Sequence, residues 1–220
     1  MKIAQLAGLI SIFLCFPGLA QAEPQLYETG PSEESSYVRF VNATENTIEI
    51  ISSNGSAKVE LNANTDGRAS HFFTVKAASK LTATLQGKGR KGSVEVTGKP
   101  WEYITVAIFP DATAKLRTML VRETPDDFNA MRASVSLFNL DASCTATMQG
   151  GAKKATILEG VKPFTVQRRL INPVNLSATV GCGGQNTKVD LGQLEAGGRY
   201  SVFLSSLKNA HQAWFVHDAN

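Results

Sequence analysis

Histidine and cysteine are scarce in this chain, with three of each among 220 residues. Neither a G-x-S-x-G nucleophile elbow nor an H-E-x-x-H helix occurs, which excludes two common designs of hydrolytic enzymes. Those motifs do not cover a triad whose members are scattered along the chain, so an enzyme is not excluded as a class. The sequence predicts no particular catalytic residue, no metal ligand and no cofactor.

Long apolar runs and an excess of one charge are lacking as well. Beyond the first 22 residues no stretch is long and apolar enough to cross a bilayer. Residues 1–22 resemble a secretory signal, with a basic start at Lys2, an apolar centre and an A-x-A cleavage site that ends at Ala22. Without Lys2 the chain carries 21 basic and 19 acidic residues, a balance that argues against nucleic acid as a partner. We expect an exported protein without a membrane span after cleavage.

Three segments recur in the same order along the chain. The sequence VRFVNATENTIEI at 38–50 returns as VSLFNLDASCTAT at 135–147, an offset of 97 residues. LTATL at 81–85 returns as LSATV at 176–180, and Tyr103 of YITVAIF matches Tyr200 of YSVFL. Each segment is a short run rich in β-branched and aromatic residues, which is typical of β-strands. The pattern indicates one β module used twice.

The predicted fold class is all-β, with two tandem antiparallel β-sandwich domains that arise from an internal repeat of about 97 residues. Val38 should superpose on Val135, and Tyr103 on Tyr200. Lys115–Val121 could add one more strand, and Asp126 or Asp127 could begin a helical turn. The expected boundaries are a signal peptide at 1–22, an N-terminal extension at 23–36, a first sandwich at 37–110, a structured connection at 111–131 and a second sandwich at 132–220.

Two of the three cysteines, Cys144 and Cys182, follow the predicted signal peptide. A one-residue slip in the turn would let Cys144 take the inward place of Ile48, and Cys182 is in phase with the inward Val180. A disulfide is the first expectation for two inward cysteines in an oxidising compartment. A pair of reduced core thiols is the alternative. A metal role is disfavoured because neither cysteine has a histidine near it in the sequence.

One cluster of positive charge occurs, in the loop that contains Lys88, Arg90 and Lys91 between glycines. Charges on a solvated hairpin that prevent aggregation are the simpler interpretation. Contact with a polyanion or with an acidic patch on a partner is the functional alternative. Four strand aromatics, at Trp101, Tyr103, Trp214 and Phe215, could stack on sugars, although core packing is the commoner role for such residues.

The chain resembles the AlgF family of periplasmic alginate O-acetylation proteins in several ordered segments. These are Leu26-Tyr27, Gly30-Pro31, SYVRFVNA at 36–43, DFN at 127–129 leading into VSLFNL at 135–140, and INPV at 171–174. Together they span nearly the whole chain after the signal, although no single motif is specific. The paired cysteines and the basic loop are not features of that family in general.

The resemblance implies a periplasmic accessory or adaptor protein required to acetylate polymannuronate during exopolysaccharide biosynthesis. Its partners would be a membrane O-acyltransferase and periplasmic acetyltransferases, and the anionic polymer itself is a further candidate. The family offers no catalytic residues to carry over. Two other classes remain: a secreted carbohydrate-binding β-sandwich module, and an acetyl carrier or esterase in which a serine or His71 takes the acetyl group.

Overall fold

The computed structural model describes residues 34–125, 129–208 and 210–218. The predicted signal peptide at 1–22 lies outside the described residues, as do most of the predicted extension and the helical turn expected at Asp126 and Asp127. Sixteen strands and one short 3-10 helix, η1 (Thr65–Gly67), make up the regular structure of the described part. No helix in that part is long and apolar enough to cross a membrane.

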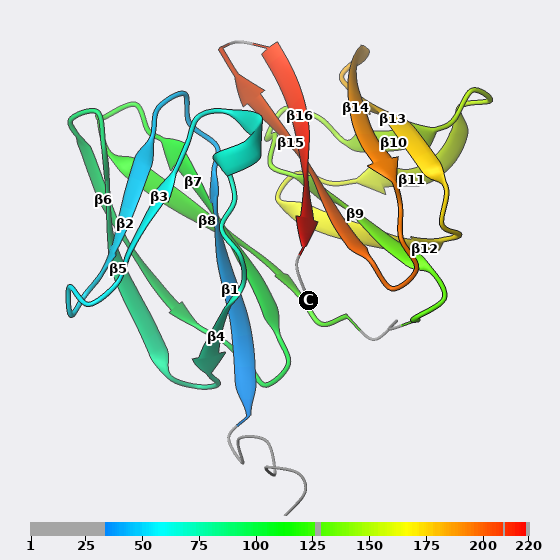
Figure 1. Cartoon of the computed structure of the whole chain (residues 1–220). Helices are drawn as coiled ribbons and strands as arrows, with labels where there is room; N and C mark the ends of the chain where they lie inside the picture. Colours follow the sequence, from blue (N-terminus) through cyan, green and yellow to red (C-terminus); the bar gives the residue numbers. More distant parts are fainter. Residues whose placement is uncertain (1–33, 126–128, 209, 219–220) are drawn as a thin grey trace, which may run out of the picture. The chain divides into compact units, whose positions relative to one another are not determined.

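Eight strands form the first sandwich, which runs from blue to green in Figure 1. One sheet has the order β4-β1-β7-β8, and its strands are β1 (Ser35–Asn42), β4 (Phe73–Lys76), β7 (Tyr103–Pro110) and β8 (Leu116–Glu123). The other has the order β3-β2-β5-β6, with β2 (Ile48–Ser52), β3 (Lys58–Leu61), β5 (Lys80–Gly87) and β6 (Arg90–Thr97).

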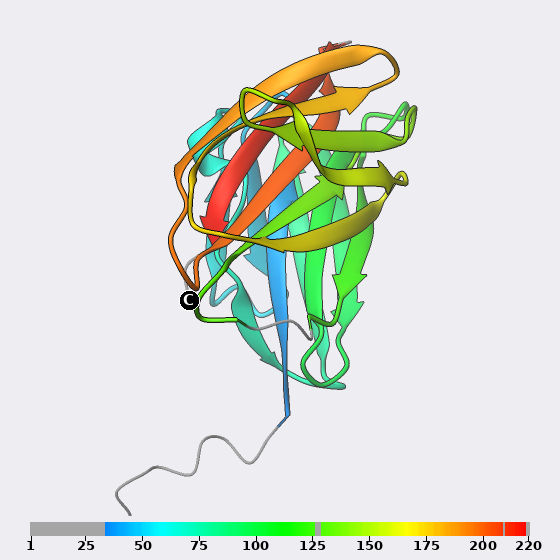
Figure 2. The ribbon, with the colours of Figure 1, turned by 90° about the vertical axis from the view of Figure 1, so that its right-hand side faces the viewer.

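The second sandwich repeats this plan and faces the viewer in Figure 2. Its sheet β12-β9-β15-β16 contains β9 (Ala133–Asn139), β12 (Thr165–Ile171), β15 (Arg199–Leu207) and β16 (Ala210–Asp218). Its sheet β11-β10-β13-β14 contains β10 (Ala146–Gly150), β11 (Ala155–Val161), β13 (Asn175–Cys182) and β14 (Gln185–Gln193). Each strand number is that of the first sandwich plus eight, so the all-β class and the internal repeat are confirmed.

Each sandwich contains one parallel pair, a detail that the antiparallel prediction missed. Strand β1 runs parallel to β7, and β9 runs parallel to β15. A parallel pair needs a long crossover, and here the crossover passes through the opposite sheet before the chain returns. Short turns between successive strands are visible in the sequence, whereas the pairing of distant strands is not.

The register confirms part of the predicted superposition and corrects the rest. Val38 lies opposite Ile104, and its counterpart Val135 lies opposite Tyr200. Tyr200 is therefore equivalent to Ile104 and not to Tyr103, a shift of one residue. Because one residue reverses the face of a strand, Tyr103 points out of its sandwich while Tyr200 points into its core.

The segments 81–85 and 176–180 do occupy the same place in their domains. Leu85 lies opposite Ile50, and Val180 lies opposite Met148. Strand β8 also pairs along its whole length with β7, from Tyr103 to Pro110. The first sandwich therefore ends at Glu123, not at residue 110, and the connection is shorter than the predicted 111–131.

Three separate apolar clusters hold the described fold together. Two fill the interiors of the sandwiches, around Leu85 and Ile104 in the first and around Leu137 and Val202 in the second. The third joins residues of both sandwiches, on the outward faces of the sheets that contain β1 and β9. Those two sheets are buried on both faces, which explains the uninterrupted burial of β9.

Candidate functional site

A buried arginine stands at the centre of the contact between the two sandwiches. Val38 and Phe40 of β1 point into the core of the first sandwich. Arg39 lies between them in the sequence, so its side chain points to the opposite face of the strand, where it is buried against the second sandwich. Its Nη1 lies 2.6 Å from the Asp218 carboxylate, and its Nη2 donates to the Ser201 hydroxyl at 3.0 Å.

Aromatic rings enclose the same guanidinium group. Its central carbon lies 4.5–4.9 Å from the centroids of Phe72, Phe138 and Phe203. Burial lowers the pKa of Arg39 below its usual value, although the Asp218 carboxylate opposes this shift. An arginine keeps its charge under such conditions. The interface therefore holds a full positive charge, which the Asp218 and Glu123 carboxylates and the ring faces compensate.

A second ion pair repeats this arrangement with the roles of the two sandwiches exchanged. Arg168 of β12 contacts Glu123 of β8 at 2.8 Å, and both side chains are largely buried. By register, Glu123 is the counterpart of Asp218 at the end of the last strand of its domain. Each sandwich thus supplies one arginine and one carboxylate to the other, which fixes their relative orientation.

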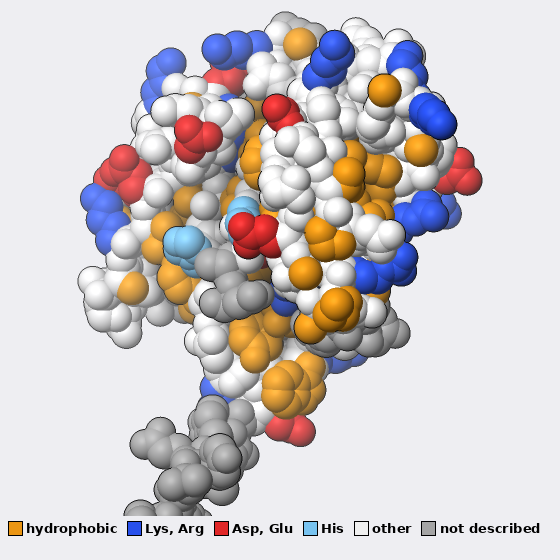
Figure 3. Space-filling view, turned by 45° about the vertical axis from the view of Figure 1, so that its right-hand side comes forward, with side chains coloured by type: hydrophobic (Ala, Val, Ile, Leu, Met, Phe, Trp, Pro, Cys, Tyr) orange, Lys and Arg blue, Asp and Glu red, His pale blue; other side chains and the backbone are white. Residues whose placement is uncertain are grey.

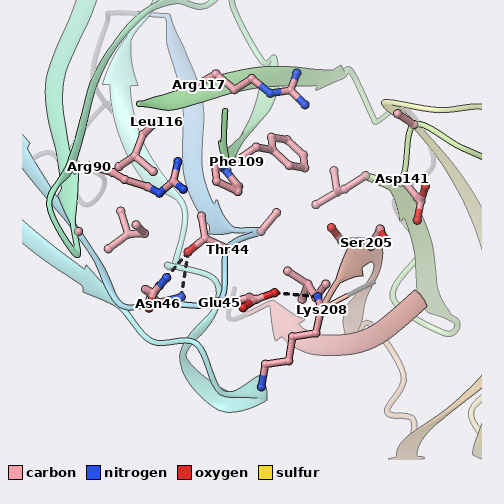
Figure 4. Close-up of a pocket in the computed structure, with 18 of the residues that line it drawn as sticks. Thr44, Glu45, Asn46, Arg90, Phe109, Leu116, Arg117, Asp141, Ser205 and Lys208 are labelled. Carbon is pink, nitrogen blue, oxygen red and sulfur yellow. Dashed lines mark hydrogen bonds between the residues drawn. The ribbon is translucent and has the colours of Figure 1, made fainter. Parts of the chain in front are cut away.

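A pocket of about 580 Å³ lies beside this interface. Turns from both sandwiches line it: the residues that follow β1 and β9, and the β7–β8 and β15–β16 hairpins. Figure 4 shows Arg90 and Arg117 on the same side of the pocket, next to Leu116 and Phe109. Because residues of both sandwiches form its walls, the pocket exists only while the two domains are docked.

The charged residues of the pocket are three basic and two acidic. Arg90 donates from Nη1 to the carbonyl oxygen of Asp111 at 2.9 Å, and Arg117 lies over the Phe109 ring at 5.2 Å. The Glu45 carboxylate accepts the backbone N–H of Lys208 at 2.8 Å, as Figure 4 shows. The other acidic residue is Asp141. The two arginines are thus the cations that are held in position on one wall.

The predicted basic loop is a two-residue turn between β5 and β6, and it divides its three cations. Lys88 and Gly89 have positive φ angles of 44° and 75°, as such a tight hairpin turn requires. Of the three cations only Arg90 lines the pocket, whereas Lys88 and Lys91 are exposed at a smaller depression. On the face shown in Figure 3, Lys and Arg side chains are spread among acidic ones and form no single patch. Whether the loop contacts a polyanion stays a prediction.

The four strand aromatics differ in burial. Trp214 is buried in the contact between the sandwiches, and Tyr103 and Phe215 are partly buried, as the core interpretation predicted. Trp101 is 63% exposed and stands in the turn before β7 with a φ of 62°. Its core assignment was wrong because Trp101 precedes the strand.

The predicted disulfide between Cys144 and Cys182 is present, with a Cα–Cα distance of 5.5 Å. The proposed slip in the turn was wrong, however. Ala146 pairs with Val161 as Ile48 pairs with Leu61, so Ala146 takes the inward place of Ile48. Cys144 stands two residues earlier, before β10.

The smaller residue at 146 removes one of two contacts that would exclude a side chain from the position of Cys182. Cys182 corresponds to Gly87 in the first sandwich, where a Cβ atom would lie 2.5 Å from the Thr47 carbonyl oxygen and 2.7 Å from the Ile48 Cδ1 atom. Such contacts are too close for a side chain. The second sandwich has alanine at the place of Ile48, so the side-chain contact is absent there, and the cysteine pair occupies the same corner.

His211 lies next to the disulfide, which the sequence did not indicate. Its Nδ1 atom lies 2.8 Å from the Asp141 carboxylate, whose other oxygen accepts the N–H and O–H of Ser143 at 2.8 and 2.6 Å. Burial opposes ionisation of Asp141, but the bonds from Ser143 and His211 outweigh it and lower the pKa of this carboxyl. The carboxylate is therefore charged and fixed at neutral pH.

We expect the stability that Asp141 provides to depend on pH. Its pKa is lower in the folded than in the unfolded protein, so its contribution is complete above the ordinary value of 3.8 and is lost as the pH falls through the folded value. Asp141→Asn should therefore lower the thermal unfolding temperature at neutral pH. The gap between the variant and the wild-type protein should narrow as the pH falls below 3.8. An equal gap at all pH values would contradict this prediction.

Comparison with known protein families finds no match for the chain. No curated protein matches it either. Among solved structures it is similar to a candidate cell adhesion protein from Bacteroides uniformis, with 10% identity, 85% of this chain and 97% of that chain covered, and a TM-score of 0.28.

Two other solved structures have similar values. One is the family 26 carbohydrate-binding module of Amy13K from Eubacterium rectale in complex with maltoheptaose, with 12% identity, 82% and 96% coverage and a TM-score of 0.24. The other is the tip fimbrial protein Mfa3 from Porphyromonas gingivalis, with 8% identity, 86% and 100% coverage and a TM-score of 0.26. Similarities at this level carry no argument about what the chain does.

Proposed function

We propose that this protein is a periplasmic adaptor for the O-acetylation of alginate, and that its pocket holds the anionic polymer. The observation that carries the binding part is the pair Arg90 and Arg117 on one wall of a pocket that both sandwiches line. The sequence resemblance to the AlgF family supports the pathway. The partners are then a membrane O-acyltransferase and periplasmic acetyltransferases, and the protein supplies no catalytic residue of its own.

The chemistry of the pocket suits a uronic acid chain. Polymannuronate carries one carboxylate on each sugar, and a guanidinium group matches a carboxylate with two parallel hydrogen bonds. Phe109 and Leu116 line the pocket beside those charges, but they are only 7% and 5% exposed and offer a sugar ring a small apolar surface. Each contact is weak, about 0–1 kcal/mol for a pair that stays near solvent, so binding should fall as salt rises. A site of this kind orients a polymer and lets it pass on.

Removal of the two arginine charges should weaken the binding of short mannuronate oligomers. Arg90→Gln/Arg117→Gln removes both charges and keeps polar side chains, and it should lower affinity by as much as about 30-fold, since two pairs of up to about 1 kcal/mol each contribute at most about 2 kcal/mol. The matched control is Lys88→Ser/Lys91→Ser, which removes the exposed charges of the same hairpin. Isothermal titration at two salt concentrations measures both.

An unchanged affinity in the arginine variant would contradict the pocket as the polymer site. A loss in the lysine variant alone would move the site to the hairpin tip, where the sequence predicted it. A parallel test in cells asks whether each variant, or the triple change of Lys88, Arg90 and Lys91 to serine, restores polymer acetylation. Restoration by the arginine variant despite weak binding would favour a role in protein contacts only.

Binding of neutral carbohydrate is the second candidate, and exposed Trp101 favours it. An indole that is 63% exposed on a rigid turn can stack on a sugar ring without a charge. Trp101→Ala should then abolish the binding of neutral oligosaccharides and leave the mannuronate oligomers unaffected. An acetyl carrier would differ from both: the protein would gain one stable acetyl mass when it is incubated with an activated acetyl ester.

A further inference from the structure

Four side chains that commonly bind metals meet at one corner of the second sandwich. Asp141 follows β9, Cys144 precedes β10, Cys182 ends β13, and His211 is near the start of β16. One ligand-type atom from each lies within 4.8 Å of all the others. Residues that are 70 positions apart in sequence thus form a cluster of two sulfurs, an imidazole and a carboxylate.

The first sandwich builds the same corner without any of these groups. By register and turn hydrogen bonds, the four positions correspond to Thr44, Asn46, Gly87 and Leu116. Asn42 and Asn139 make matching hydrogen bonds in the two turns, so the backbone geometry does not depend on the cluster. The fold therefore does not require a cysteine pair, a histidine and an aspartate together.

We propose that reduction of the Cys144–Cys182 disulfide opens a zinc site formed by Cys144, Cys182 and His211. In the disulfide the sulfurs are bonded to each other and carry no charge, so they are poor ligands. A dithiol reductant would deliver two electrons and two protons to the disulfide and would itself become a disulfide. Binding of Zn²⁺ to the two resulting thiols then releases both protons.

The ligand set suits Zn²⁺, which prefers nitrogen and sulfur ligands in a tetrahedron. The cysteine Cα atoms are 5.5 Å apart, so two thiolates can reach one ion with small side-chain rotations. His211 Nε2 and the Cys144 Cβ atom lie 3.9 and 4.0 Å from the place that a Cβ would take on Gly183. The free nitrogen of the ring is therefore on the side of the sulfurs.

Asp141 is positioned to orient His211 as a zinc ligand. Its carboxylate holds His211 Nδ1 at 2.8 Å and is itself fixed by Ser143. A carboxylate on the second nitrogen fixes the tautomer that leaves the other nitrogen free for the metal. Three protein ligands leave the fourth tetrahedral position open. Asp141 also lines the pocket between the sandwiches, which brings the cluster close to that space.

The test uses Co²⁺ and Zn²⁺ on the purified protein, before and after reduction under argon. Reduced protein should bind one metal ion per chain, with the thiolate-to-cobalt charge-transfer absorption and the strong visible bands of a tetrahedral cobalt centre. The oxidised protein should bind none. Circular dichroism with and without Zn²⁺ checks that the reduced protein is folded.

Three variants assign the ligands. His211→Ala should weaken the binding of Zn²⁺ by at least tenfold, and Asp141→Asn by about 10–100-fold. His217→Ala is the matched control, because this histidine stacks on Tyr200 away from the cluster, and it should bind like the wild-type protein. Equal binding by oxidised protein, an unchanged affinity in His211→Ala, or a reduced protein that stays unfolded with Zn²⁺ would each overturn the proposal.

Discussion

Arg39→Met is expected to destabilise the protein by about 3–5 kcal/mol, one of the largest effects of any single substitution here. Methionine is unbranched, apolar and of similar volume, so the change removes the charge without leaving a large cavity. It leaves the Asp218 carboxylate, which is 11% exposed, without its cation and with only the hydrogen bond from Ser201, and it leaves the Ser201 hydroxyl with one bond fewer. For a chain of this size the thermal midpoint should fall by about 6–20 °C.

Trp214 makes the effect observable at the interface itself. It is buried among the residues that join the sandwiches, whereas Trp101, the only other tryptophan, is exposed. In a Trp101→Phe background, fluorescence during chemical denaturation therefore follows the separation of the two domains. We expect the Arg39 variant to lose this signal at lower denaturant than the loss of β structure measured by circular dichroism.

Two further variants separate the charge from the packing. Arg39→Met/Asp218→Leu should recover part of the lost stability, because replacing both members of a buried ion pair by apolar groups is often neutral. Lys80→Ala, at an exposed ion pair with Glu95, should have little effect. A cost below about 1 kcal/mol for Arg39→Met would contradict the role that we assign to this residue.

The repeat was visible in the sequence because period-two alternation reports which residues face a core. Alternation predicted the inward rows of both modules, and it placed Cys182 correctly in phase with Val180. The same alternation puts Arg39 on the face opposite to Val38 and Phe40, and in the structure that face packs on the second sandwich. A period-two pattern cannot tell a solvated face from one that packs on a second domain.

The errors in register have a different physical origin. Matching Tyr103 with Tyr200 rewarded identical residues, although a one-residue offset pairs Tyr200 with Ile104. Identical residues in two repeats are weaker evidence of equivalence than a match in which face of the strand each residue occupies, because a shift of one residue moves a side chain to the opposite face.

The site could be predicted only in part. The cation cluster pointed to Arg90, but its partner Arg117 stands alone in the sequence between Leu116 and Thr118. His211 and Asp141 are 70 residues apart, and only the pairing of distant strands brings them to the disulfide. Local spacing carries information on turns and strands, whereas a site assembled from four loops depends on tertiary contacts that no spacing encodes.

The disulfide should contribute the second large effect. Closing a loop with a sequence separation of 38 restricts the unfolded chain, and the chain-entropy estimate for such a loop is at most about 4 kcal/mol. We therefore expect reduction of the wild-type protein, with a chelator present to exclude metal, to lower the free energy of unfolding by about 2–4 kcal/mol. Urea denaturation under oxidising and reducing conditions measures the difference.

Cys144→Ala/Cys182→Ala provides the matched comparison, because reduction keeps both sulfur atoms in place while the double variant removes them. Cys182 is buried beside Ala146, so the variant should be less stable than the reduced wild-type protein by the cost of a small cavity. If the reduced protein is as stable as the oxidised one, the covalent link adds nothing to a corner that already packs well. The second sandwich would then resemble the first, whose corresponding corner is packed by Ile48 and Gly87 without a disulfide.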